Sequence, residues 1–156
     1  MEIEGYKTLQ RSDISEDKKS GYGTICLSTI DNSEYPKSFL NNGNGSHVQL
    51  QIINFSSFTV VYGYASPKAS FCDYKKVILT IFQEHQLNGS TTIVMGDFNQ
   101  NLNTFAGMKL VKLMKSLGMS SKLPVICSTT RSGTQIDCIF TGIQETEAYV
   151  STVSTV

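Results

Sequence analysis

Residues 90–99 read STTIVMGDFN, a short strand-like run that ends in two polar side chains. The segment Thr92 to Met95 is typical of a buried strand, because β-branched and apolar residues favour strands. Since alternate side chains share a face of an extended segment, we expect Asp97 and Asn99 to point the same way and Phe98 to enter the core. A carboxylate and a carboxamide in such a place need partners. The pattern therefore indicates a catalytic or metal-binding pair, and the alternative is an Asx turn that carries no chemistry.

The chain before this stretch is rich in predicted strands. Residues 24–30 contain many β-branched side chains and predict one strand. In residues 47–55, apolar positions alternate with Gln49 and Gln51, which is the pattern of a half-buried strand. Residues 57–64 carry apolar side chains on both faces and predict a central strand.

The N-terminal third also contains polar and turn-forming segments. Residues 1–20 indicate a solvated loop after a brief ordered start at 3–9. The sequence NNGNGS at 41–46 is a strong turn signal and predicts a hairpin between residues 35–40 and 47–55.

Two amphipathic helices flank the opening stretch. Ser70 or Asp73 can cap a helix that runs to about Leu87. A second helix is predicted at 106–117, with its lysines outward as a solvated face or as a nucleic-acid contact. The residues predicted to point inward are Phe71, Tyr74, Val77, Ile78, Ile81 and Phe82 in the first helix, and Met108, Val111, Leu113 or Leu110, and Met114 in the second. Further strands at 134–140 and 148–156 complete a strand-rich α/β mixture with helices covering sheet faces.

Composition limits the class of protein. The 156 residues include 40% hydrophobic residues, enough for the core of one domain, and 13 basic residues balance 13 acidic ones. This balance gives no global electrostatic case for nucleic acid or membrane, although a local basic patch is compatible with it. The four cysteines, Cys26, Cys72, Cys127 and Cys138, form no CxxC pair and fit no zinc motif. Because Cys26, Cys127 and Cys138 lie in or beside β-prone segments, we expect buried thiols, with two disulfides as the alternative. The charged N-terminus lacks the apolar core of a signal peptide, and no run approaches ~18 apolar residues, so we expect an intracellular protein with no membrane partner.

Polar residues recur in the predicted central strands or at their ends. Tyr64 ends one strand, Asp97 and Asn99 end the next, and Asp137 lies inside a third. Neighbouring strands of a layered sheet commonly bring their ends to one edge, so we expect these residues to meet there. The carboxylates offer oxygen ligands to a divalent metal or a base for water, and the amide and phenol offer donors to negative charge. The set is suited to a phosphate and Mg²⁺.

The same residues resemble a known family. GDFN at 96–99, YASP at 64–67 and TTRSGTQIDCIF at 129–140 are similar to motifs of the endonuclease/exonuclease/phosphatase superfamily, above all its copies attached to mobile-element reverse transcriptases and DNA helicases. The resemblance covers essentially the whole chain. It implies an α/β (α+β) sandwich of two packed, mostly antiparallel β-sheets flanked by helices, which is the DNase I-like fold, as one partial domain over residues 1–156. It also implies phosphodiester hydrolysis with Mg²⁺ or Mn²⁺, DNA as partner, and a larger polyprotein with a helicase or reverse transcriptase.

The resemblance also implies a role for each matched residue. Asp97 would orient or deprotonate the attacking water and is the candidate metal ligand in this chain. Asn99 would bind the scissile phosphate, and Tyr64 would donate to a phosphate oxygen in the transition state. Asp137 would orient a catalytic histidine. The segment that would lie near the substrate contains Thr130 and Arg131.

Three family residues have no match. The metal-binding glutamate would precede the segment that resembles Gly5-Tyr6, and an asparagine would lie on a strand before that glutamate. The final histidine would follow the last residue, and neither His47 nor His85 matches it. We therefore expect a domain that is truncated at both ends. Three interpretations follow: a DNA endonuclease whose full site needs further residues, an inactive relic of one, and a phosphatase or phospholipid hydrolase of the same fold.

Overall fold

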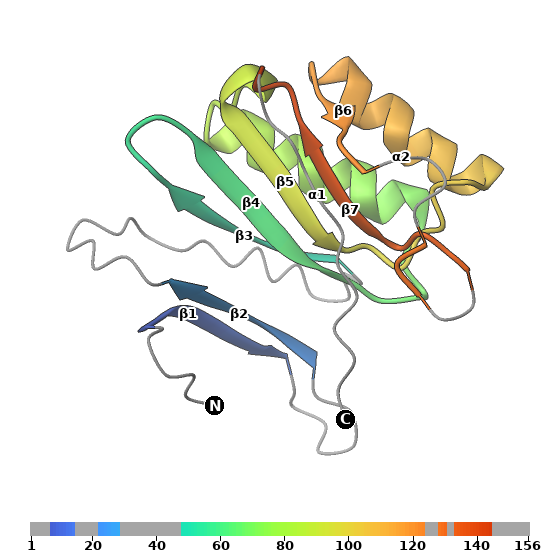
Figure 1. Cartoon of the computed structure of the whole chain (residues 1–156), viewed down its shortest axis with the longest axis horizontal. Helices are drawn as coiled ribbons and strands as arrows, with labels where there is room; N and C mark the ends of the chain where they lie inside the picture. The colour runs from blue at the N-terminus through green and yellow to red at the C-terminus, as the bar shows by residue number, and fades with distance from the viewer. Residues whose placement is uncertain (1–6, 15–21, 29–47, 124–127, 131–132, 145–156) are drawn as a thin grey trace.

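The computed structural model describes residues 7–14, 22–28, 48–123, 128–130 and 133–144, which form two β-sheets and two α-helices (Figure 1). The smaller sheet is the antiparallel pair of β1 (Lys7–Ile14) and β2 (Tyr22–Ser28). The larger sheet has the strand order β3-β4-β5-β7-β6. Its strands are β3 (Val48–Asn54), β4 (Thr59–Ala65), β5 (Thr92–Asp97), β7 (Asp137–Thr141) and β6 (Ser120–Ser121). The helices are α1 (Phe71–Glu84) and α2 (Phe105–Ser116), with a short 3₁₀ turn η1 (Gly89–Thr91) before β5.

The larger sheet is mixed. The β4–β5 pair is parallel and is connected through α1, whereas the β3–β4, β5–β7 and β6–β7 pairs are antiparallel. Both helices lie against one face of this sheet, and β2 contacts β4 of the larger sheet (Figure 1). The predicted mixture of two sheets with flanking helices is confirmed, and so is the central position of the strand at 57–64.

Helix α1 begins as the sequence indicates. Ser70 is the N-cap: its Oγ accepts from the amide of Asp73 at 3.3 Å, and its own amide donates to Oδ2 of Asp73 at 2.7 Å. This reciprocal pair is a capping box, which satisfies amides that have no partner inside the helix. The helix ends at Glu84 with His85 as C-cap, before the predicted Leu87.

Helix α2 differs from expectation at one inward position. Thr104 is its N-cap, and its buried side chains include Leu110, Leu113 and Met114, as predicted. The prediction for Met108 is wrong, because this side chain is 49% exposed. The buried stripe begins at Gly107 instead, which turns the neighbouring position toward solvent. All three lysines of α2 are exposed, as expected.

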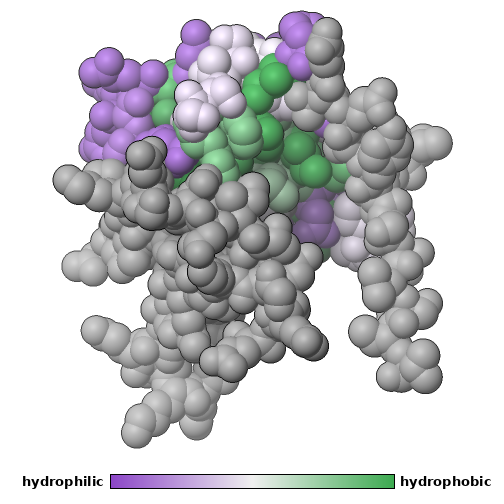
Figure 2. All heavy atoms as spheres, turned by 60° about the vertical axis from the view of Figure 1, so that its left-hand side comes forward, coloured by the Kyte–Doolittle hydropathy of each residue, from purple (hydrophilic) through white to green (hydrophobic). Residues whose placement is uncertain are grey.

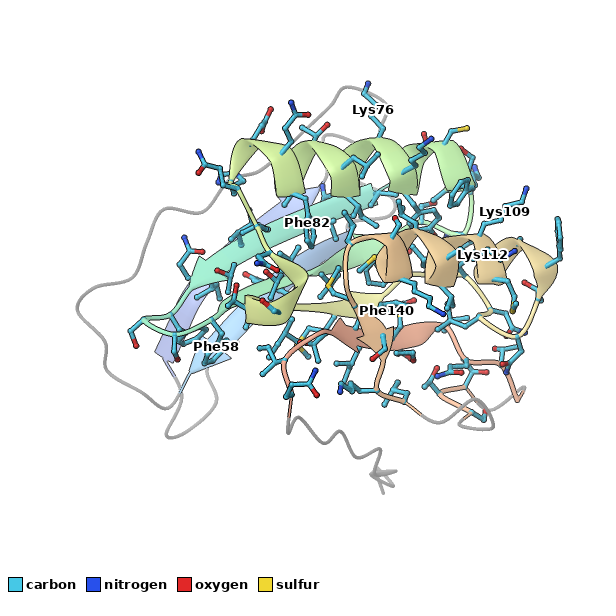
Figure 3. The ribbon with its side chains drawn as sticks, turned by 90° about the horizontal axis from the view of Figure 1, so that it is seen from above. Phe58, Lys76, Phe82, Lys109, Lys112 and Phe140 are labelled. Carbon is cyan, nitrogen blue, oxygen red and sulfur yellow. The ribbon has the colours of Figure 1, made fainter. Side chains whose placement is uncertain are left out.

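The core lies between the helices and the larger sheet. Figure 3 shows Phe82 of α1 and Phe140 of β7 in this layer. Phe98 is 1% exposed in the same cluster, which confirms its predicted inward direction. Full burial of such a side chain contributes about 1.5–3 kcal/mol. Figure 2 shows hydrophobic residues in the middle of the face that it presents, with hydrophilic residues gathered along its upper left.

Three expectations about strands are wrong. Residues 10–14 belong to β1 and not to a loop, because backbone pairing with β2 extends to Ile14 despite the polar side chains. β3 is buried on both faces and not half-buried: Gln51 is 0% exposed. β7 begins at Asp137 and not at residue 134, because the preceding residues are held in a loop by hydrogen bonds to threonine side chains.

Some predictions fall outside the described residues. These are the first arm of the hairpin at 35–40, the strand at 148–156, and the positions of Cys127 and His47. In the part of the chain that the structure describes, no helix has the length and hydropathy needed to cross a membrane.

Candidate functional site

Three of the predicted site residues form one row across the sheet. Tyr64 of β4 is the register partner of Asp97 of β5, and Asp97 is the register partner of Asp137 of β7. Side chains of directly opposite residues lie on the same face, so all three share the face of the sheet that the helices do not cover. The expected meeting of these residues at one edge of the sheet is confirmed.

The same row continues into β3 with a residue that the sequence did not single out. Gln49 is the register partner of Tyr64 and is 9% exposed. Its Oε1 is buried and has no hydrogen-bond partner among the described residues. The alternation in residues 47–55 indicated a solvent-facing glutamine here, and only the pairing with β4 places it beside the site.

The chain turns sharply after Asp97. Asn99 has φ +49°, in the left-handed region, so the segment is not extended through Asn99 as expected. The amide of Asn99 donates to Oδ1 of Asp97 at 2.9 Å, and its side-chain Nδ2 donates to the carbonyl oxygen of Ala65 at 2.9 Å. The segment therefore forms an Asx turn, which ties Asn99 both to Asp97 and to the end of β4.

Phe98 anchors this turn to its surroundings. Its amide donates to the carbonyl of Ile136 at 3.0 Å, and its ring stacks on Tyr74 of α1 with centroids 6.0 Å apart. The hydroxyl of Tyr74 donates to the carbonyl of Phe98. In the sequence, Tyr74 is one apolar position of a helical stripe, and nothing there indicates that its hydroxyl reaches the backbone between the two polar site residues.

Replacing Tyr74 by phenylalanine is expected to destabilise the fold by about 1–2 kcal/mol, because the buried carbonyl of Phe98 loses its donor while the ring still packs. Urea unfolding of the two proteins measures this difference. Amide exchange at Asn99 should accelerate more than exchange within α1, since the lost contact holds the turn. If amide exchange accelerates equally in both helices and in the larger sheet, Tyr74 supports the fold in general and not this turn.

The loop before β7 is organised by threonines. Oγ1 of Thr129 accepts from the amides of Ile136 at 3.0 Å and Asp137 at 3.2 Å, which fixes where β7 begins. The hydroxyls of Thr130 and Thr134 lie 2.7 Å apart, and the amide of Thr134 donates to Oγ1 of Thr130 at 3.1 Å. Thr130 thus has a structural role in closing the turn. The other predicted substrate-contacting residue, Arg131, lies outside the described residues.

The electrostatics of the row raise one carboxyl pKa. Partial burial raises the pKa of Asp97, the amide of Asn99 lowers it in part, and the nearby carboxylate of Asp137 raises it further. Burial and the same two carboxylates raise the pKa of the Cys138 thiol far above its usual range. Cys138 therefore stays protonated, and its thiol is not a nucleophile.

The donor set is suited to a hard cation. Asp97 and Asp137 bring carboxylate oxygens to adjacent positions. A divalent ion bound there would relieve the repulsion between the two negative charges. Mg²⁺ commonly takes only one or two carboxylates and completes its shell with water and phosphate oxygens. Within the described ranges, no group of three or more His, Cys, Asp or Glu side chains comes together. The residues present thus fit a weak site in which substrate oxygens provide much of the coordination.

Comparison with solved structures finds similar folds. The endonuclease domain of TRAS1, a telomere-specific non-LTR retrotransposon, superposes with a TM-score of 0.58 at 14% identity, over 92% of this chain and 69% of that one. An endonuclease/exonuclease/phosphatase family protein from Leptotrichia buccalis C-1013-b gives 0.55 at 15% identity, over 88% of this chain and 60% of that one. No protein-family model and no curated protein matches the sequence. The likeness, at these identities, is a likeness of fold.

Proposed function

We propose that this chain, which has the DNase I-like fold of the endonuclease/exonuclease/phosphatase proteins, hydrolyses phosphodiester bonds of DNA with the help of a divalent metal ion. One observation carries the proposal. Tyr64, Asp97 and Asp137 share one row of the sheet, and Asn99 is tied to Asp97 by a hydrogen bond at the same edge. The row and the turn after β5 thus bring a phenol, two carboxylates and an amide together at the end of the sheet.

Each of these residues has its own role in hydrolysis. Asp97 orients or deprotonates the attacking water through its carboxylate, whose Oδ1 accepts from the amide of Asn99. Tyr64 donates to a phosphate oxygen on which negative charge grows, and Asn99 holds the phosphate from the turn. Asp137 keeps its own carboxylate beside Asp97, where it would orient a histidine.

The metal ion belongs at the same carboxylate. Asp97 would hold Mg²⁺, or Mn²⁺ in its place, because carboxylate oxygens are the ligands that these ions prefer. When bound, the ion stabilises the charge that develops on the phosphate. The amide of Asn99, by donating to Oδ1 of Asp97 at 2.9 Å, fixes the orientation of the carboxylate that would face the ion.

DNA is the proposed substrate because a sequence motif of this chain and the fold of a solved endonuclease domain both favour a nuclease. The TTRSGTQID segment resembles the nucleases of mobile elements, and TRAS1 is a retrotransposon whose endonuclease domain shares the fold. A further part of the proposal is that the domain works inside cells, next to a helicase or reverse transcriptase in a larger polyprotein. Sequencing the transcript on both sides of the coding region tests that part.

A substrate panel tests the activity. The chain is incubated with supercoiled plasmid, with a phosphomonoester and with phosphoinositide vesicles, each in Mg²⁺, in Mn²⁺ and in EDTA. We expect nicking of the plasmid with either metal and none in EDTA, and Asp97→Asn serves as the control for contaminating nuclease. Turnover of the phosphomonoester or the lipid alone would replace DNA as the substrate. Equal rates for the chain and its Asp97→Asn variant on every substrate would identify an inactive relic.

A further inference from the structure

The outer face of α2 carries exposed side chains that the proposed site does not use. We define the α2 stripe as Phe105, Met108, Lys109 and Lys112, which follow one another at positions i, i+3, i+4 and i+7 and so share one face of the helix. Phe105 is 80% exposed and Met108 is 49% exposed. Two large apolar side chains grouped on the outer face of a helix that buries Leu110, Leu113 and Met114 indicate a surface with a partner.

The stripe is also positively charged. Between Phe105 and Ser116, helix α2 contains Lys109, Lys112 and Lys115 and no acidic residue. The Nζ of Lys109 lies over the ring of Phe105, 5.2 Å from its centroid, which is a cation–π contact. Figure 3 shows Lys109 and Lys112 on α2. A flat aromatic face beside several ammonium groups complements a polyanion with ring systems.

The stripe begins next to the loop that bears the site. Gly107 lies so close to Asn101 that a Cβ at this glycine would be 2.2 Å from the Asn101 carbonyl oxygen, so the first turn of α2 packs directly on the loop. The amide of Leu102 donates to the carbonyl of Gln135 at 3.1 Å, in the segment that leads into Asp137. The start of α2, the loop and the beginning of β7 are thus joined at the same edge of the sheet (Figure 1).

We propose that the α2 stripe binds an unpaired segment of the nucleic acid that is cleaved at the neighbouring site, with a base stacked on Phe105 and phosphates on the lysines. The identity of the nucleic acid bound by the stripe rests on the proposed function. Stacking suits any base, because every base has a π-face, whereas a paired base offers no free face. Lys109 and Lys112 are about 4.5 Å apart along the helix axis, so both ammonium groups can reach the backbone of one strand.

The test measures binding separately from cleavage. Fluorescence anisotropy with a labelled oligothymidylate of about 16 nucleotides, in EDTA so that no cleavage occurs, gives the Kd of the chain and its variants. We expect Phe105→Ala to weaken binding about 5- to 100-fold and Phe105→Tyr to restore it. The pair Lys109→Ala/Lys112→Ala should reduce the slope of log K against log salt by about 1.4.

Matched controls keep the test decisive. Lys75→Ala/Lys76→Ala removes the same charge from exposed positions of α1, where Figure 3 shows Lys76, and should leave the Kd within twofold. The proposal is overturned if the unmutated chain does not bind the oligonucleotide, if the stripe variants bind as it does, or if polyglutamate binds as tightly and with no loss in Phe105→Ala. If binding depends on the stripe but no plasmid is nicked, the proposed function is contradicted and the binding of nucleic acid by the stripe is supported. If nicking depends on Asp97 but the stripe variants bind as the unmutated chain does, the proposed function is supported and the binding by the stripe is contradicted.

Discussion

Gly96→Ala is expected to destabilise the protein by at least about 3 kcal/mol, a large fraction of the stability of a marginally stable domain. A Cβ at this position would lie 2.0 Å from the carbonyl oxygen of Gly63 on the adjacent strand, and that oxygen is backbone and cannot move aside. The residue also has φ +147°, which side-chain-bearing residues rarely adopt. Both effects fall one residue before Asp97, so the strand must be remodelled where the site begins.

A second glycine separates these two effects. Gly118 has φ +78°, but a Cβ there would meet nothing within 4 Å. Gly118→Ala should therefore destabilise the protein only through the strained backbone conformation, by about 1–2 kcal/mol. Chemical denaturation followed by circular dichroism measures both variants. Equal losses at the two positions would contradict the close approach of β4 and β5 at Gly96.

Asp97→Asn is expected to lower the rate of phosphodiester cleavage by about 10²- to 10⁴-fold and, at neutral pH, to make the fold more stable. The loss of rate follows because the amide is neither a base nor a good ligand for a metal ion. The gain in stability follows because an asparagine at this position carries no charge to be desolvated or repelled by Asp137. Initial rates on plasmid and thermal unfolding of the same samples measure the two effects.

The stability difference should depend on pH in a set direction. The pKa of Asp97 is raised in the folded chain, so the folded state binds the proton more tightly than the unfolded state does. The penalty of the charged form is present in full above the folded pKa. It is relieved as the pH falls from that value toward the ordinary aspartate pKa of 3.8. The stability advantage of Asp97→Asn should thus be largest near neutral pH and shrink on acidification.

The partner carboxylate offers a check on the cause. Asp137→Asn removes the repulsion while leaving Asp97 in place, so the pKa of Asp97 should fall when it is followed by carbon NMR of the carboxyl group. An unchanged pKa would show that burial alone raises it. A stability advantage of Asp97→Asn that grows on acidification would contradict the assignment of the raised pKa to this residue.

Much of the fold could be predicted because local patterns agree with the final packing. The capping box at Ser70, the apolar spacing of α1 and the strand that ends at Asp97 are all visible in the sequence. The three polar site residues could be predicted to meet, since parallel and antiparallel neighbours place strand ends at a shared edge. Phe98 could be directed inward from alternation alone.

The remaining features depend on contacts between distant segments. β1 is mostly polar, with Leu9 and Ile14 as its apolar residues, and its pairing with β2 makes it a strand. The hydroxyl of Tyr74 finds its acceptor 24 residues away, and Thr129 fixes the start of β7 from eight residues before Asp137. Gln49 belongs to the site row only through its register with Tyr64. Periodicity carries no information about such pairings, because it reports a residue's face and not its neighbour.

The row of site residues also sets the order in which the site can appear during synthesis. Chains emerge from the ribosome N-terminus first, so β4, α1 and β5 are available before β7. Until β7 adds to the open edge of β5, Asp97 has no carboxylate beside it and the row of site residues is incomplete. A nascent chain that has released only β3 to α2 therefore contains Tyr64, Asp97 and Asn99 without the carboxylate of Asp137 beside them.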